Sequence, residues 1–163
     1  EIAARIYRRC FKDGTFIKAF GTNGYGPGQL RQPHALNIDP ATGHVYVADR
    51  INSRIVIFDQ DGKYLHRWTQ FGMPSDIVFD AQGNIYVADS ESDALENTGW
   101  EKGIRIGKVK SGFVEHFIPD GGDNPPFTEH GSGPESLAVD RHGNIFAGEP
   151  RNHALQKYIN VWK

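Results

Sequence analysis

Short runs of β-branched and aromatic residues alternate with glycine-containing turns along most of the chain. Three segments, 33–49, 74–89 and 134–149, share one order: a proline, an apolar strand ending in Asp, a turn with Gly, and a second strand ending in an acid. Apolar runs bounded by such turns predict β-hairpins. No stretch shows helical periodicity with capping residues, so the pattern predicts an all-β chain.

The spacing of these segments predicts a β-propeller. Their turn glycines, Gly43, Gly83 and Gly143, lie 40 and 60 residues apart. A period of about 40 to 50 residues is typical of four-stranded propeller blades. We therefore expect about three blades, the second with an insertion of about 20 residues, mainly residues 90–102. Third and fourth strands are expected at 54–59, 63–68, 104–110 and 113–118.

The predicted organisation is a single propeller segment over residues 1–163. We expect residues 1–21 to supply the outer strands of a preceding blade, because residues 5–17 resemble 54–65. Residues 33–70 form a blade, 74–119 a blade with the insertion, and 134–163 a partial blade whose third strand starts at 154.

Three blades are too few to close a ring, and open strand edges favour association. Two interpretations stay open. In the first, the chain is a homodimer in which two copies self-associate into a six-bladed ring. In the second, it is a fragment that assembles with a missing N-terminal half.

Composition and charge narrow the range of partners. The chain is 38% hydrophobic and 12% aromatic, enough for a packed core. The formal net charge of −2 argues against a dedicated nucleic-acid binder and against an electrostatic membrane-surface protein. No apolar run approaches the roughly 20 residues that span a bilayer. Cys10 is the single cysteine, so no internal disulfide forms.

Several spaced motifs resemble NHL repeats, and their combination is similar to peptidyl-α-hydroxyglycine α-amidating lyases and the bacterial relatives of those enzymes. That family has six-bladed propellers, and this chain resembles the C-terminal half of one. The bacterial members are often exported, which implies an extracytoplasmic location. The motifs that carry the resemblance are residues 26–30, 33–34, 47–50, 52–55, 58–59 and 99–107.

The resemblance also implies chemistry. The family uses a zinc ion held by three histidines near the central channel, a structural calcium, and essential Tyr and Arg residues. It cleaves a C-terminal α-hydroxyglycine to leave a peptide amide and glyoxylate. His34 falls on a zinc-ligand position, and Arg50 on the family's catalytic arginine. Glu135 stands where the final blade has a ligand histidine, and Ser136 where it has a calcium-ligand aspartate. The implied cofactor is zinc or calcium, held by His34 and Glu135.

Inner strands of a propeller start at the central channel, so residues 34, 75 and 135 are expected to converge there. An imidazole and a carboxylate facing one axis suit a divalent ion, but such residues also line channels and bind only water. Asp76 lies next to this ring. Arg50 either clamps a substrate carboxylate through its planar fork or pairs with a neighbouring carboxylate of the chain.

Two loop residues are further candidates for contact with a ligand on the rim. Trp100 lies in the insertion, where its alternative role is to contact its own blade. His130 lies in a segment rich in Gly, Pro and Asp, and loop histidines commonly have no chemical role. Asp49, Asp89 and Glu149 recur at one blade position, and we interpret them as backbone-capping residues rather than catalytic acids.

Two classes of function follow. The chain is either a metal-dependent lyase of the amidating type or a non-catalytic NHL scaffold that binds a protein, peptide or small molecule on one rim. The incomplete ligand set favours the scaffold, whereas His34 together with Arg50 favours the enzyme. A metal-dependent lactonase of another six-bladed type is a weaker third hypothesis.

Overall fold

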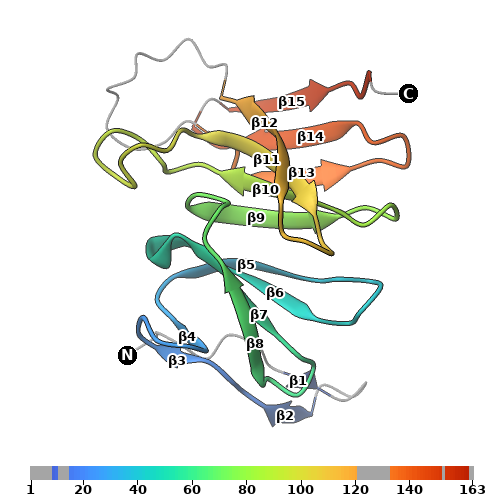
Figure 1. Ribbon diagram of the computed structural model, residues 1–163. Coiled ribbons are helices and arrows are strands. Elements are labelled where there is room, and N and C mark those ends of the chain that lie inside the picture. Colours follow the sequence, from blue (N-terminus) through green and yellow to red (C-terminus); the bar gives the residue numbers. More distant parts are fainter. Residues whose placement is uncertain (1–8, 11–14, 121–132, 152, 162–163) are drawn as a thin grey trace.

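The computed structural model describes residues 9–10, 15–120, 133–151 and 153–161, and most of these residues lie in antiparallel sheets stacked one after another (Figure 1). No α-helix occurs in these ranges, and a single 3-10 turn, η1 (Arg50–Asn52), follows one of the strands. None of the described helical structure is long and apolar enough to cross a membrane. The predicted all-β propeller segment of about three blades is confirmed.

Three sheets make up the blades, and each runs outward from an inner strand. In the first two blades every strand pairs with the next one along the chain, and the third blade shows three strands among its described residues. The first blade holds β5 (Pro33–Ile38), β6 (Val45–Asp49), β7 (Arg54–Phe58) and β8 (Tyr64–Trp68). The second holds β9 (Pro74–Phe79), β10 (Asn84–Asp89), β11 (Gly103–Lys108) and β12 (Val114–Pro119), and the third β13 (Ser136–Val139), β14 (Ile145–Glu149) and β15 (Ala154–Tyr158).

Two short strand pairs precede the first blade. β1 (Arg9–Cys10) pairs antiparallel with β2 (Phe16–Lys18), and β3 (Thr22–Asn23) pairs parallel with β4 (Gln29–Leu30). Leu30 is buried against the first blade, where it packs on Val45, Val47, Val56 and Phe58.

The turn between the first two strands of the second blade explains why the repeat carries Asp and Gly. The Asp80 carboxylate accepts the amide hydrogens of Gln82 and Asn84, both at 2.9 Å, and Gly83 has φ +77°. Burial alone would raise the pKa of Asp80, but hydrogen bonds from Asn84, Tyr86 and Gln82 lower it. The acid thus closes the hairpin, and glycine takes the left-handed conformation that other residues avoid.

The core between the first and second blades is aromatic. The Tyr46 ring lies 5.3 Å from Trp68 and 5.0 Å from Phe79, and Trp68 lies 5.8 Å from Phe71. Tilted and edge-on ring pairs of this kind add about 0.5–1.5 kcal/mol each beyond the burial of their area. The corresponding core between the second and third blades contains Tyr86, Ile104, Ile145 and Ala147.

The inner strands lie side by side and are joined by side-chain hydrogen bonds. Asn37 Nδ2 donates to the Ile77 carbonyl at 3.0 Å, and the Leu137 amide donates to Asp76 Oδ2 at 2.7 Å. These bonds link β5 to β9 and β9 to β13. The three inner strands therefore start at one end of the stack, where their first residues form a common rim.

Burial of two tyrosines predicts a specific response to alkaline pH. Burial, assisted by Asp39, raises the pKa of Tyr46 to about 12, and burial with the Asp80 hydrogen bond raises that of Tyr86 to about 12. Because folding favours the neutral phenol, this stabilisation is complete below the ordinary pKa of 10.0 and is lost as pH rises through about 12. A spectrophotometric titration of tyrosinate is expected to show late-titrating tyrosines, of which one is absent in Tyr46→Phe and another in Tyr86→Phe. Titration of every tyrosine near pH 10 in the folded protein would contradict this.

Candidate functional site

The first two inner strands start with a shift in pairing register. Pro33 pairs with Asp49 but Ala35 pairs with Ala48, so His34 is an extra residue; the second blade skips Ser75 in the same way. In the third blade, the Glu135 amide donates to the Gly148 carbonyl at 2.9 Å just before β13. An extra residue at such a shift re-aims its side chain, a device often found beside binding sites.

His34 is exposed, and its ring orientation is set by a neighbouring blade. Nδ1 lies 2.8 Å from the Ser75 carbonyl oxygen. Because a carbonyl only accepts hydrogen bonds, Nδ1 carries the proton, and Nε2 of the neutral ring keeps its lone pair. His34 therefore offers one acceptor or ligand nitrogen.

The Arg50 side chain contacts acidic residues from both the second and the third blade. Its Nε donates to Gln32 Oε1 at 3.1 Å, and one terminal nitrogen lies 3.3 Å from Glu91 Oε1 and 3.9 Å from Glu135 Oε1. The side chains of Arg50, Glu91 and Glu135 are 14%, 23% and 36% exposed. We call Gln32, Arg50, Glu91 and Glu135 the rim cluster. It unites Arg50 and Glu135, two residues singled out from the sequence, in one contact.

Ser75 differs from the sequence-based expectation that it faces the channel. Its side chain is fully buried, and its Oγ lies 2.6 Å from Ser90 Oγ, which is buried as well. Ser75 and Ser90 hold the positions that His34 and Arg50 hold in the first blade. Two small hydroxyl groups satisfy one another there, so the second blade contributes Glu91, one residue further on, to the rim.

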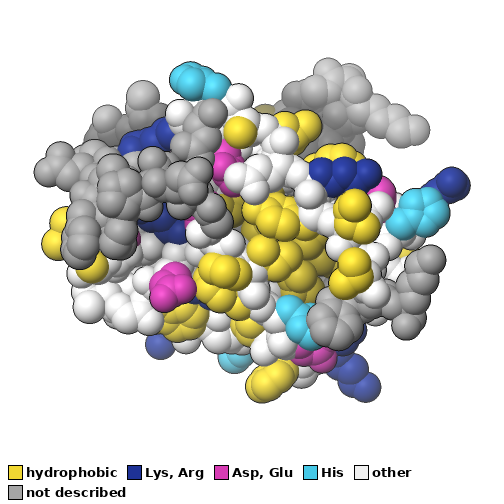
Figure 2. Space-filling model, turned by 90° about the horizontal axis from the view of Figure 1, so that it is seen from above, with side chains coloured by type: hydrophobic (Ala, Val, Ile, Leu, Met, Phe, Trp, Pro, Cys, Tyr) yellow, Lys and Arg dark blue, Asp and Glu magenta, His cyan; other side chains and the backbone are white. Residues whose placement is uncertain are grey.

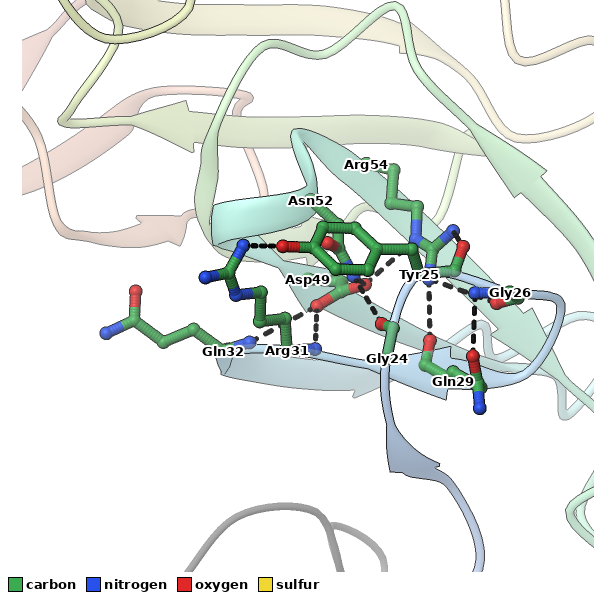
Figure 3. A network of polar contacts seen from close by, with 9 residues as sticks. All are labelled: Gly24, Tyr25, Gly26, Gln29, Arg31, Gln32, Asp49, Asn52 and Arg54. Atoms are coloured by element: carbon green, nitrogen blue, oxygen red, sulfur yellow. Dashed lines mark hydrogen bonds and ion pairs between the residues drawn. The ribbon is translucent and has the colours of Figure 1, made fainter.

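Asp49 lies beneath this rim at the end of β6 and is the centre of a polar network (Figure 3). The buried carboxylate accepts the Arg31 amide at 2.7 Å, Asn52 Nδ2 at 2.6 Å and Arg54 Nε at 2.8 Å. Arg54 in turn donates to the carbonyl oxygens of Tyr25, Gly26 and Gln29. The acid therefore fixes the loop that leads into the inner strand.

Asp89 repeats this arrangement in the second blade. It accepts the amides of Met73 at 3.1 Å and Ser92 at 2.9 Å, and Arg105 pairs with it at 2.9 Å. Burial raises the pKa of Asp89, and the Ser92 hydrogen bonds and the Arg105 charge limit that shift. A Cβ at Gly72 would collide with this carboxylate, so the close approach requires glycine. The hydrogen bonds made by Asp49 and Asp89 agree with the capping role inferred for them.

The remaining candidates have structural partners or lie outside the described residues. Asp76 accepts the amides of Ile77 and Leu137, which joins two inner strands. The Trp100 ring lies 4.8 Å from the Arg105 guanidinium, so it contacts its own blade. His130 lies outside the described residues.

The sequence pattern of the NHL repeat matches residues 30–58 and 71–93, which cover the inner strands and first hairpins of the first two blades, with Asp49 and Asp89. The chain contains NHL repeats. Over 81 residues it is 42% identical to NHL repeat-containing protein 3 of Homo sapiens, which covers 47% of this chain and 23% of that protein. Over 153 residues it is 26% identical to peptidyl-glycine alpha-amidating monooxygenase A of Xenopus laevis, which covers 90% of this chain and 16% of that protein. The chain thus spans less than a quarter of these relatives.

Solved structures share the fold of this NHL-repeat chain. Virginiamycin B lyase from Staphylococcus aureus superposes with a TM-score of 0.61 at 14% identity, covering 95% of this chain and 48% of that one. Hydrazine synthase of Kuenenia stuttgartiensis gives 0.59 at 16% identity, over 83% of this chain and 33% of that one. At such identities the likeness shows the fold alone.

The described residues of these NHL blades do not by themselves fit the zinc that the amidating-lyase resemblance implies. Glu135 lies within 3.9 Å of the Arg50 guanidinium, whose charge opposes a divalent cation at that carboxylate. Within ranges 9–10, 15–120, 133–151 and 153–161, no three His, Cys, Asp or Glu side chains lie close enough to hold an ion. A structural zinc needs four ligands and a catalytic one three.

Sequence reasoning missed Glu91 and Gln32. Glu91 corresponds to Ile51 in the first blade and to Arg151 in the third, so no acid recurs at this position and the repeat comparison does not point to it. Gln32 precedes an inner strand and lacks a distinctive motif. The partners of the acids were also missed: Arg54 directly faces Asp49 across the sheet, whereas Arg105 reaches Asp89 from two residues further along its strand.

The buried Asp49–Arg54 pair predicts a large loss of stability on neutralising the acid. Asp49→Asn leaves a buried guanidinium without its counter-charge, which costs about 3–5 kcal/mol. Glu115→Gln is the matched control, because the Glu115–Lys108 pair is about 40% exposed and such pairs contribute about 0–1 kcal/mol. Urea unfolding of both variants checks this. Equal, small losses of the free energy of unfolding would mean that the Asp49 network does not hold the blade.

Proposed function

We propose that this chain is a non-catalytic NHL-repeat binding domain, and that its rim cluster takes a ligand with a carboxylate, such as a peptide C-terminus. The proposal rests on the different distances between the Arg50 guanidinium and its three partners. Gln32 and Glu91 hold the guanidinium at 3.1 and 3.3 Å, whereas Glu135 approaches only to 3.9 Å.

Glu135 is the partner of Arg50 that a ligand carboxylate can replace. Its side chain is 36% exposed, and ion pairs in such positions contribute about 0–1 kcal/mol. A ligand carboxylate that meets Arg50 in bidentate geometry makes shorter, charge-assisted hydrogen bonds than Glu135 makes at 3.9 Å. Exchange of one carboxylate for another also keeps the charge of the cluster unchanged.

His34 supplies a second contact at the same end of the first blade. Pro33, its neighbour, pairs with Asp49, the residue before Arg50. With Nδ1 bonded to Ser75, the His34 ring keeps Nε2 as an acceptor for an N–H group. A peptide offers this combination, since its terminal carboxylate lies next to an amide N–H.

A metal-dependent lyase of the amidating type is the second candidate. It is favoured by the similarity to peptidyl-glycine alpha-amidating monooxygenase A, which extends over 90% of this chain. Zinc or calcium would then be held by His34 and Glu135 together with ligands from outside the described residues. Arg50 would bind the substrate carboxylate in both functions, so the metal separates the two.

Binding of a peptide pair tests the first candidate. N-acetyl-Phe-Gly as the free acid is expected to bind, and its C-terminal amide to bind at least about tenfold more weakly, a difference of about 1.4 kcal/mol. Arg50→Ala is expected to abolish the difference, and Glu135→Gln to strengthen binding of the acid because the competing carboxylate is removed. Isothermal titration calorimetry measures both peptides against the unsubstituted protein and against each variant. Equal affinity for acid and amide would sink the carboxylate site.

Metal titration tests the second candidate. Zinc or calcium added to the purified chain is expected to leave the unfolding temperature unchanged, because Arg50 opposes a cation at Glu135. His34→Ala is the matched variant. Stabilisation by either ion that disappears in His34→Ala would overturn the non-catalytic proposal and support the lyase.

A further inference from the structure

The rim cluster holds more negative than positive charge at neutral pH. Glu91 Oε1 lies 3.3 Å and Glu135 Oε1 3.9 Å from the same terminal nitrogen of Arg50, so two carboxylates share one guanidinium. Figure 2 shows a face of the molecule on which acidic side chains lie apart from one another around a hydrophobic centre. The rim cluster is different, because it brings two acids to one cation and leaves one negative charge unbalanced within it.

Two basic residues close to the cluster in sequence have partners of their own. Arg31 precedes the cluster, and its guanidinium stacks 5.0 Å from the Tyr25 ring and donates to the Tyr25 hydroxyl. Lys102 lies at the end of the insertion, with Nζ 3.7 Å from Asp93 Oδ2. Both cations are therefore engaged by groups outside the rim cluster.

The two acids of the cluster are not equally fixed. The Glu91 side chain is 23% exposed, and its backbone amide donates to the buried Asp89 carboxylate at 3.2 Å. Glu135 is more exposed, at 36%, and lies farther from the guanidinium. A ligand carboxylate that binds Arg50 therefore displaces Glu135 and leaves Glu91 in place.

This exchange leaves a carboxylate without a cation. Arg50 keeps the same number of carboxylate partners, but Glu135 stays nearby because its backbone amide donates to the Gly148 carbonyl at 2.9 Å. The released carboxylate then lies beside the bound one. Like charges repel strongly where a site is partly buried and water screens them less than in bulk solution. A positive charge supplied by the ligand removes this repulsion.

We propose that the rim cluster prefers peptides whose C-terminal residue is lysine or arginine. The α-carboxylate of the peptide replaces Glu135 on Arg50, and the basic side chain of the same residue pairs with the released Glu135 carboxylate. A long, flexible basic side chain reaches an acid that has moved a short way from Arg50. This inference rests on the proposed carboxylate site and adds the class of ligand that the site selects.

Two peptides that differ in a single charge test the preference. N-acetyl-Phe-Lys and N-acetyl-Phe-norleucine are each prepared as the free acid and as the C-terminal amide. We expect the lysine acid to bind at least about threefold more tightly than the norleucine acid, as a partly exposed ion pair allows. The two amides are expected to bind equally weakly, because Glu135 then stays on Arg50. Isothermal titration calorimetry measures the four affinities, and high salt is expected to reduce the preference for lysine.

Three variants assign the preference to one carboxylate. Glu135→Gln is expected to abolish the difference between the lysine and norleucine acids, and Glu91→Gln to retain it. Glu115→Gln is the matched control, because it changes the net charge by the same amount at the other end of the second blade, where Glu115 pairs with Lys108. It is expected to keep the full preference for lysine.

The outcomes separate this inference from the function on which it rests. A norleucine acid that binds no better than its amide would remove the carboxylate site, and the inference with it. A norleucine acid that binds better than its amide, without any gain for lysine, would overturn the inference alone. A preference for lysine that persists in Glu135→Gln, or that disappears in Glu115→Gln as well, would also overturn it, because general attraction to a negative chain would then explain the binding.

Discussion

A buried acid at the end of the second strand holds each of the first two blades together. Asp49 and Asp89 are fully buried, and each bonds to an arginine from the third strand and to backbone amides of the loop before the inner strand. One carboxylate therefore joins three segments that are distant in sequence. Loss of its charge would leave a buried guanidinium without its counter-charge and would weaken the hydrogen bonds from the backbone amides in a dry environment.

This constraint determines where side chains can differ between blades. Because the acid fixes the ends of the inner and second strands, the residues just beyond them are held in place whatever their identity. The first blade places His34 and Arg50 there, whereas the second places two serines that bond to each other. The NHL blades thus act as a common scaffold, and the chemistry of the rim depends on a few positions that the scaffold leaves free.

The repeat pattern predicted the fold because strand, turn and capping residues recur at one period, and each recurrence reports the same local geometry. It also brought Arg50 and Glu135 to attention. It could not predict Glu91, because no acid recurs at that position of the repeat, nor the burial of Ser75, which depends on its contact with Ser90. The repeat pattern also could not predict that Leu155 is exposed, because exposure depends on the elements that cover a strand.

The central claim is that each acid holds the entry loop of its own blade, and amide hydrogen exchange of the folded protein tests it most directly. The Arg31 amide reports on Asp49, and the Met73 and Ser92 amides report on Asp89. In Asp49→Asn we predict that exchange at Arg31 becomes fast while Met73 and Ser92 stay protected, with the reverse pattern in Asp89→Asn. Exchange that is unchanged at all three amides, or that rises equally at all three in either variant, would contradict the account.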